Sequence, residues 1–221
     1  MAFPISIVES TQADFSASLR SPQGTPLFPH IWAIGNLAIL EKRLLGLFCS
    51  TRCPGEIILP TYDLARALRD AEVPVISGFH SPMEKECLSL LLRGTQPVII
   101  CPARSLERIR ISAEWTVPLT QGRLLLLSPF TGKDHRATAQ LAEKRNEFVA
   151  RIAEKVFVAH AAPGSKTERF CHEVSDWGKA LLTLESDENT NLLPLGAKPV
   201  RPEALGKDWQ RSTSQAIRSA G

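Results

Sequence analysis

The chain has 221 residues, 43% of them hydrophobic and 22% charged, with a formal net charge of +3 and a pI near 8.7. These values are close to the averages of soluble globular proteins, and this length can bury a sizeable core as one domain. No apolar stretch approaches the roughly 18 residues of a membrane span, and no basic segment with a long apolar run opens the chain. We therefore expect a cytoplasmic protein without a membrane partner. The small basic excess neither indicates nor excludes nucleic acid.

The first part of the chain combines a polar segment with the first buried strand that we predict. Residues Glu9–Gln23 are polar and rich in serine, which is typical of a loosely packed tail, and we place an N-terminal tail at residues 1–25. Leu44–Cys49 is a compact apolar run that predicts a buried strand. Pro54 and Gly55 break this run, and a helical pattern follows them.

The same alternation of apolar runs and helical patterns continues along the chain. Val73–Ile76 ends in a Ser-Gly pair, and a helix is predicted from Pro82, which suits a first helical turn, to Leu92. The later apolar runs are Val98–Cys101, Leu124–Leu127, Val156–Ala159 and Leu181–Leu184. The helical segments after them are Ser105–Ile111, Ala137–Ile152 and Lys166–Trp177. This alternation predicts an α/β fold, Rossmann-like, with a mostly parallel sheet and helices on both faces.

The segment after Val200 is charged and low in large apolar residues. It predicts a C-terminal tail over residues 201–221, which leaves residues 26–200 as the core.

The cysteines indicate neither a disulfide framework nor a metal centre. They are odd in number and include no CxxC pair, and the spacing of Cys49 and Cys53 suits zinc poorly. The five are Cys49, Cys53, Cys87, Cys101 and Cys171. We expect reduced thiols that pack as small hydrophobes, with no metal and no cofactor.

Three loops are predicted to meet at one edge of the sheet, where ligands bind in doubly wound folds. They are Ser50–Gly55, Ser77–Pro82 and His160–Thr167. Hydroxyl groups, glycines that admit a close backbone approach, two cations and helix N-termini together suit a phosphate. The candidate binding residues are Ser50, Arg52, Ser77, Gly78, Ser81, Gly164, Ser165, Lys166 and Thr167. The same residue types also serve simply as turn and cap residues.

Seven segments in a fixed order extend this pattern over residues 26–200. They are Pro29–Leu37, Leu47–Pro54, Val75–Phe79, Gly122–Ser128, Arg145-Asn146, Gly164–Thr167, and Asn191–Leu193 with Gly196-Ala197. In this order they resemble the DprA/Smf family of DNA-processing proteins. The second resembles that family's Gly-Ser-Arg-x-Pro loop, the third its Val-Ser-Gly-Leu element, the fifth its Arg-Asn-Arg motif and the sixth its Ser-Gly-Ser-x-x-Thr phosphate loop.

The resemblance implies a Rossmann-like core that binds single-stranded DNA and dimerises, with Arg145 and Asn146 among the binding residues. Two motifs depart from the family's pattern. His80-Ser81-Pro82-Met83-Glu84 stands where the family has Ala-Arg-Gly-Ile-Asp, so Ser81 replaces an arginine that contacts phosphate. Val158-Ala159-His160-Ala161 replaces Val-Val-Glu-Ala. A site that has lost an arginine and gained a histidine can bind another ligand or carry out chemistry.

An enzymatic interpretation therefore stays open. Pro163–Glu168 loosely resembles the Pro-Gly-Gly-x-Gly-Thr-x-x-Glu motif of the LOG nucleotide phosphoribohydrolases, which cleave N-glycosidic bonds. Such cleavage needs a carboxylate, for which Glu84 and Glu168 are the candidates, and often an acid, for which His160 is the candidate. Helix-dipole stabilisation explains both glutamates equally well.

A third interpretation concerns a protein partner. A nucleotide-sensing or antitoxin-like protein in an anti-phage or stress system would need another protein as its partner.

Two aromatic residues, Trp115 and Phe130, are expected in loops near the sheet edge. If the protein binds DNA, they either stack on bases or pack in the core, and we favour packing in the core.

Overall fold

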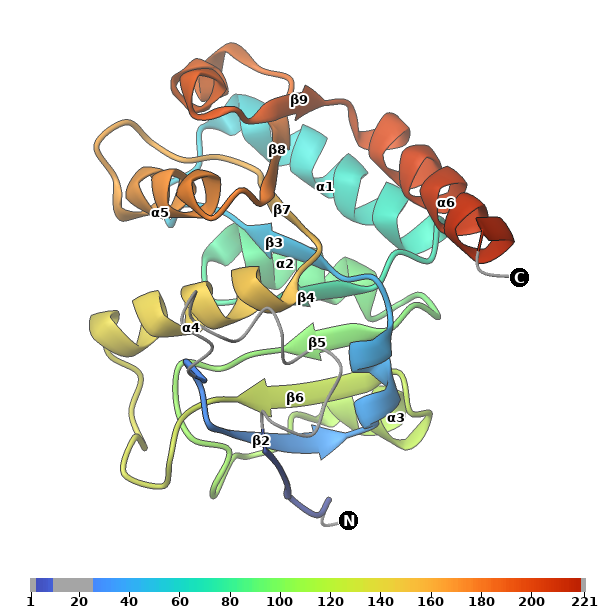
Figure 1. Cartoon of the computed structure of the whole chain (residues 1–221), viewed down its shortest axis with the longest axis vertical. Helices are drawn as coiled ribbons and strands as arrows, with labels where there is room; N and C mark the ends of the chain where they lie inside the picture. Colours follow the sequence, from blue (N-terminus) through green and yellow to red (C-terminus); the bar gives the residue numbers. More distant parts are fainter. Residues whose placement is uncertain (1–2, 10–25, 220–221) are drawn as a thin grey trace.

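Nine strands form one sheet in the computed structural model, which describes residues 3–9 and 26–219 (Figure 1). The strand order is β1-β2-β6-β5-β4-β3-β7-β8-β9. The strands are β1 (Ser6–Glu9), β2 (His30–Gly35), β3 (Leu45–Phe48), β4 (Val75–Ser77), β5 (Val98–Ile100), β6 (Leu124–Ser128), β7 (Lys155–Val158), β8 (Ala180–Leu184) and β9 (Lys198–Val200). The pairings β1–β2 and β2–β6 are antiparallel and the other six are parallel, so the prediction of a mostly parallel sheet is confirmed.

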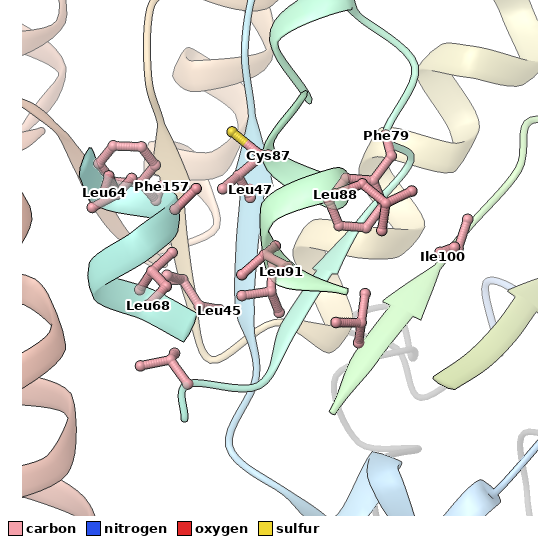
Figure 2. Packing of buried hydrophobic residues seen from close by; sticks show 14 of the residues in the cluster. Leu45, Leu47, Leu64, Leu68, Phe79, Cys87, Leu88, Leu91, Ile100 and Phe157 are labelled. Carbon is pink, nitrogen blue, oxygen red and sulfur yellow. The ribbon is translucent and has the colours of Figure 1, made fainter. Parts of the chain in front are cut away.

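Helices cover both faces of the sheet, as the alternation of apolar runs predicted (Figure 1). They are α1 (Gly55–Asp70), α2 (Pro82–Leu91), α3 (Ala113–Thr120), α4 (Ala139–Ile152), α5 (Lys166–Asp176) and α6 (Pro202–Ser219), with 3₁₀ segments η2 (Leu37–Glu41) and η3 (Asp187–Leu195). Alternate residues of each strand enter opposite cores: Val98 and Ile100 pack with α1, α2 and α6, whereas Ile99 packs with α4 and α5. Figure 2 shows the first core, where Phe157, Leu47 and Leu45 of the strands meet Leu64 and Leu91 of the helices.

One segment differs from the expected helices. Residues Ser105–Ile111 form a loop, and the helix begins only at Ala113. Tertiary contacts hold this loop: the Ser105 N–H donates to the Asp134 carbonyl at 2.9 Å, and Leu106 is buried. Arg108 also has a φ of +57°, which is incompatible with a continuous helix. Local periodicity was therefore overridden by packing.

Both ends of the chain contribute to the folded body, contrary to the expectation of loosely packed tails. Ser6–Glu9 pairs with β2 as an edge strand, while residues 10–25 of the proposed N-terminal tail lie outside the described residues. After Val200, helix α6 packs along α1 and buries Leu205 and Trp209 (Figure 1). The composition of residues 201–221 did not predict α6, because a few apolar side chains on one face are enough to attach a helix to the core.

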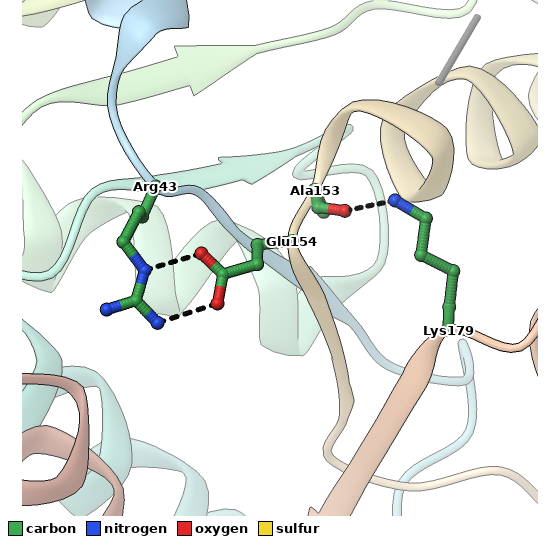
Figure 3. Close-up of polar contacts among 4 residues, drawn as sticks. All are labelled: Arg43, Ala153, Glu154 and Lys179. Carbon is green, nitrogen blue, oxygen red and sulfur yellow. Dashed lines mark hydrogen bonds and ion pairs between the residues drawn. The ribbon is translucent and has the colours of Figure 1, made fainter. Parts of the chain in front are cut away.

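Close packing and a cationic cluster attach α6 to the body. A side chain at Gly206 would lie 3.0 Å from the Ala71 Cβ and 3.1 Å from the Ala67 carbonyl, so the backbones of α6 and α1 approach closely. The Trp209 ring lies 5.0 Å from the Arg43 guanidinium and 5.6 Å from the Lys155 ammonium. Arg43 in turn holds Glu154 through two hydrogen bonds of 2.5 and 2.6 Å (Figure 3).

A lysine caps the C-terminal end of α4. The Lys179 ammonium donates to the carbonyl of Ala153 at 2.6 Å (Figure 3). It also donates to the carbonyl of Arg151 at 2.9 Å. Burial lowers the pKa of Lys179, and the cation satisfies carbonyl groups that the helix leaves unpaired. These contacts fix α4 relative to β8.

The cysteines are free thiols, and four of the five are buried. Cys49 and Cys53 share a side-chain hydrogen bond that, together with burial, raises the pKa of Cys49. In the part of the chain that the structure describes, no group of His, Cys, Asp or Glu could hold a metal ion. No helix among the same residues is long and apolar enough to cross a membrane.

We expect Trp209→Ala to lower the free energy of unfolding by about 3 kcal/mol, because it removes a large side chain that is only 3% exposed. Lys207→Ala, an exposed position on the same helix, should change it by less than about 0.5 kcal/mol. Urea unfolding followed by circular dichroism measures both. Equal stability of the two variants would show that α6 does not contribute to the folded unit.

Candidate functional site

The carboxyl ends of β3, β4 and β7 surround a pocket of about 230 Å³. Its walls come from the loops after β3 and β4, the first turns of α2 and α5, and one face of α4. The residues that line it are Cys49, Thr51, His80, Ser81, Glu84, Ala139, Ala142, Glu143, Arg145, Asn146, Lys166 and Thr167. It lies beside the β3–β7 pair, where the helical connections reverse direction, the usual ligand position in this fold class.

Glu84 connects two of the loops. One carboxylate oxygen accepts the Cys49 N–H at 2.9 Å, and the other accepts the N–H of His80 at 2.8 Å and of Ser81 at 3.3 Å. The Ser81 hydroxyl accepts the Glu84 N–H at 3.3 Å, which completes a capping box at the start of α2. Glu84 is 6% exposed and holds the end of β3 against the loop after β4.

Arg145 places a buried positive charge in the pocket. It is 4% exposed; its Nε donates to the Asn146 side-chain oxygen at 2.8 Å and its Nη1 to the Cys101 carbonyl at 3.1 Å. Burial lowers the pKa of Arg145, and the nearby Glu84 carboxylate raises it. The Nη2 group donates to no acceptor in the part of the chain that the structure describes. A buried guanidinium with spare donors suits an anionic group.

Gly78 is the residue that admits this arginine. A Cβ atom at Gly78 would overlap the Nη1 and Cζ atoms of Arg145, so the guanidinium packs directly on the glycine backbone. Close backbone approach therefore explains the glycine of the Ser-Gly pair. The adjacent Ser77 hydroxyl accepts the Phe79 N–H at 3.1 Å and keeps the loop in place.

The loop before α5 is held by Glu168 and Asn191. The Glu168 carboxylate accepts the Asn191 amide at 2.5 Å and the Gly164 N–H at 2.6 Å, and these bonds lower the pKa of Glu168. The Ser165 hydroxyl caps α5 by accepting the Glu168 N–H at 3.1 Å. Lys166 reaches the pocket rim, where it pairs with Glu143 at 2.7 Å. Both side chains are exposed, so this ion pair contributes little.

The structure brings six of the sequence-derived site residues to the pocket and leaves the others behind it or outside it. The six are Ser81, Glu84, Arg145, Asn146, Lys166 and Thr167. Ser50, Ser77, Gly78, Gly164, Ser165 and Glu168 support the loops. Arg52 is exposed and does not line the pocket.

His160 does not face the pocket. It is buried, and its Nδ1 lies 3.1 Å from the Asn189 side-chain oxygen. Asn189 itself donates to the carbonyls of Ala159 and Leu184, which makes it part of the packing around η3. The three candidate catalytic groups, Glu84, Glu168 and His160, are therefore not gathered around one reacting position.

The sequence reasoning missed Thr51, Cys49, His80 and the small face of α4. Thr51 and His80 lie inside the predicted loops Ser50–Gly55 and Ser77–Pro82, but their residue types did not indicate a binding role. The α4 face had a detectable pattern: Ala139, Ala142, Glu143 and Asn146 follow the helical spacing of one face, with small residues that leave room for a ligand.

A sequence model of the family described as DNA recombination-mediator protein A matches residues 6–191. The chain belongs to the DNA recombination-mediator protein A family. A search of curated proteins found no match.

Solved structures agree with the family fold. DNA processing protein A (DprA) from Helicobacter pylori, which binds single-stranded DNA, has a TM-score of 0.75 at 19% identity over 95% of this chain and 97% of that chain. DprA from Streptococcus pneumoniae has a TM-score of 0.72 at 16% identity over 91% of this chain and 72% of that chain. A molybdenum cofactor binding protein from Rippkaea orientalis has a TM-score of 0.51 at 12% identity over 81% and 97%. These likenesses show the Rossmann-like fold.

In this DNA recombination-mediator protein A family member, the two departures from the family motifs have structural consequences. Ser81, in place of an arginine, caps α2 and contributes a wall of the pocket. The guanidinium that packs on this loop belongs to Arg145 of α4. His160, in place of a glutamate, hydrogen-bonds to Asn189 behind the pocket.

We expect Gly78→Ala to lower the free energy of unfolding by about 1–3 kcal/mol, because the new methyl group overlaps the Arg145 guanidinium in a tightly packed region. Gly55→Ala is the matched control, since nothing lies within 4 Å of a Cβ at that position. Thermal and urea unfolding measure both variants. Equal stability of Gly78→Ala and the native protein would contradict the close approach of Arg145 to this loop.

Proposed function

We propose that this DNA recombination-mediator protein A family member binds single-stranded DNA, with a phosphate of the strand at Arg145. The observation that carries the proposal is the buried guanidinium that lines the pocket and leaves Nη2 without a described protein acceptor. A phosphate oxygen would complete the hydrogen bonding of this group. The single-stranded DNA binding of the H. pylori relative supports the choice of ligand.

Two helix N-termini strengthen the attraction of the pocket for an anion. Helices α2 and α5 begin at the loops that line it, with Ser81 and Ser165 as their caps. The positive ends of both helix dipoles therefore favour a negative group at this edge of the sheet.

The two carboxylates in the pocket do not oppose this function equally. The Glu84 carboxylate accepts hydrogen bonds from three backbone N–H groups, which stabilise its negative charge. Glu143 pairs with Lys166 at the exposed rim, where the ion pair is weak. We expect Lys166 to exchange Glu143 for a phosphate of the strand when DNA binds. We expect Arg52, which is exposed on the loop after β3, to contact a neighbouring phosphate.

Self-association remains a prediction from the family resemblance, and a cytoplasmic location remains a prediction from the sequence composition. A homodimer would present two such pockets to one strand and raise affinity through the second contact.

Arg145→Lys should weaken binding of a labelled single strand at least tenfold, because lysine cannot reproduce the fixed, multiple donors of a buried guanidinium. Lys166→Ala should weaken it several-fold and reduce the dependence of log Kd on log salt by about one. Arg66→Ala, on the exposed side of α1, is the control and should bind as the native protein does. Fluorescence anisotropy at several salt concentrations measures all three, with unfolding curves to verify the fold. Unchanged affinity in both Arg145→Lys and Lys166→Ala would contradict the proposal.

The binding proposal and the glycosidase alternative predict opposite results with DNA. Under the binding proposal, incubation of the native protein with single-stranded and modified-base DNA should leave no abasic sites, because the oxygens of Glu84 already accept backbone N–H groups. Glu84→Gln should instead lower the free energy of unfolding by about 1–3 kcal/mol. The amide has only one acceptor oxygen, so at least one hydrogen bond from a backbone N–H is lost, and the negative charge is lost with it. Abasic sites that disappear in Glu84→Gln or Glu168→Gln would establish the enzyme and overturn a purely binding role.

A further inference from the structure

Two cysteines flank the loop that follows β3, at the edge of the proposed DNA site. Cys49 comes directly after β3 and lines the pocket, and Cys53 lies two residues before α1. The chain bends at Thr51 and Arg52, and the two thiols meet in a side-chain hydrogen bond. Both side chains belong to the first core, Cys49 within it and Cys53 packed against it. The bend therefore holds two nucleophilic sulfur atoms next to each other.

The two thiols differ in their surroundings and therefore in their reactivity. Cys49 is 6% exposed, and its hydrogen bond with Cys53, together with burial, raises its pKa. Cys53 is half-buried, and the same hydrogen bond lowers its pKa, although burial opposes this. The thiolate is the nucleophilic form of cysteine, so the accessible Cys53 sulfur is the one that reacts first with an oxidant. Cys49 keeps its proton and donates it to the Cys53 sulfur.

Backbone contacts hold the loop at both of its ends. The Cys49 N–H donates to the Glu84 carboxylate at 2.9 Å, and the Ser50 N–H donates to the His160 carbonyl at 2.9 Å. At the other end, Cys53 is followed by the first turn of α1. Because both ends are fixed, little conformational entropy is lost when the two sulfurs form a bond.

The other three cysteines are not placed for the same reaction. Cys87, Cys101 and Cys171 are fully buried, and burial raises the pKa of each. Buried thiols of this kind are inert toward oxidants in solution. Cys87 of α2, labelled in Figure 2, belongs to the first core and interacts electrostatically with Cys53. It is therefore the competing partner that an experiment must distinguish from Cys49.

We propose that Cys49 and Cys53 form a reversible disulfide that regulates DNA binding at this edge of the sheet, with hydrogen peroxide as the oxidant. The Cys53 thiolate attacks one peroxide oxygen and becomes a sulfenic acid, and the hydroxide that leaves takes a proton from solvent. The Cys49 sulfur then attacks the Cys53 sulfur, and the hydroxyl group leaves with the Cys49 proton as water. In total, two thiols and one peroxide give one disulfide and two water molecules, and a dithiol reductant reverses the reaction.

The disulfide would change the loop that carries Thr51 and Arg52. A bond of about 2.0 Å replaces a hydrogen bond between the sulfurs, so the loop closes into a ring. Thr51 lines the pocket, and Arg52 is the residue that we expect to contact a neighbouring phosphate. The ring limits the positions that the Arg52 side chain can reach, so we expect this contact to be lost. This effect on DNA rests on the proposed function, whereas the disulfide itself does not.

Peptide mapping tests the disulfide. Trypsin cleaves after Arg52, so a bond between Cys49 and Cys53 joins the two peptides 44–52 and 53–66. The native protein treated with peroxide should yield this linked pair, and dithiothreitol should separate it. Cys53→Ser should yield no linked pair, and Cys87→Ala, which changes a buried thiol of the same core, should yield it as the native protein does. A link from Cys53 to Cys87, or no link in the native protein, would overturn the inference.

Fluorescence anisotropy with a labelled single strand tests the regulation. The oxidised native protein should bind about threefold more weakly than the reduced protein, as expected for one lost phosphate contact, and dithiothreitol should restore the affinity. Cys53→Ser should bind equally before and after peroxide. Arg52→Ala should already bind about threefold more weakly when reduced, and oxidation should weaken it little further.

Each part of the inference can fail by itself. Equal or tighter binding by the oxidised native protein, with the disulfide mapped, would overturn the regulatory role. A full response to peroxide in Arg52→Ala would overturn the role of that side chain. If the reduced native protein binds no single strand, the proposed function and the regulation both fail, and the peptide map alone decides the disulfide.

Discussion

The carboxylate of Glu84 holds the functional edge of the sheet in a single arrangement. Burying a charged group is costly unless hydrogen bonds and opposite charge compensate for it. Here three backbone N–H groups from two loops point at the carboxylate, and the Arg145 charge lies nearby. The end of β3, the start of α2 and the position of α4 are therefore coupled through one side chain. A change in any of them would expose an uncompensated charge.

That constraint explains why the pocket contains so few free polar groups. Most of the serine, threonine and glutamate side chains near it hold backbone N–H groups of the loops. Arg145 differs because the glycine beneath it leaves space for a guanidinium whose donors exceed the available acceptors. For the anion binding that we propose, rigid loops around one underused cation would leave little side-chain ordering to be done when the ligand binds.

The fold also shows how a domain of this family can be completed by short terminal elements. An edge strand, β1, lies at one end of the sheet, and α6 lies over α1 near the other. Trp209 connects α6 to the ion pair of Arg43 with Glu154, so the last helix is attached to β7 as well as to α1. The loops at the carboxyl edge stay uncovered by these additions (Figure 1).

The sequence by itself determined strands β3 to β8, helices α1, α2, α4 and α5, and the three loops at the edge of the sheet. Helix α2 begins at Pro82 and α5 at Lys166, as expected, because caps and apolar periodicity are local properties. Tertiary structure alone decided that Ser105–Ile111 is a loop, that α6 packs on the body, and that His160 turns toward Asn189. It also decided that the Arg145 guanidinium packs against Gly78 and that the Trp115 indole N–H has no described partner. These features depend on contacts between residues far apart in the chain, and a single sequence carries no record of which distant side chains meet.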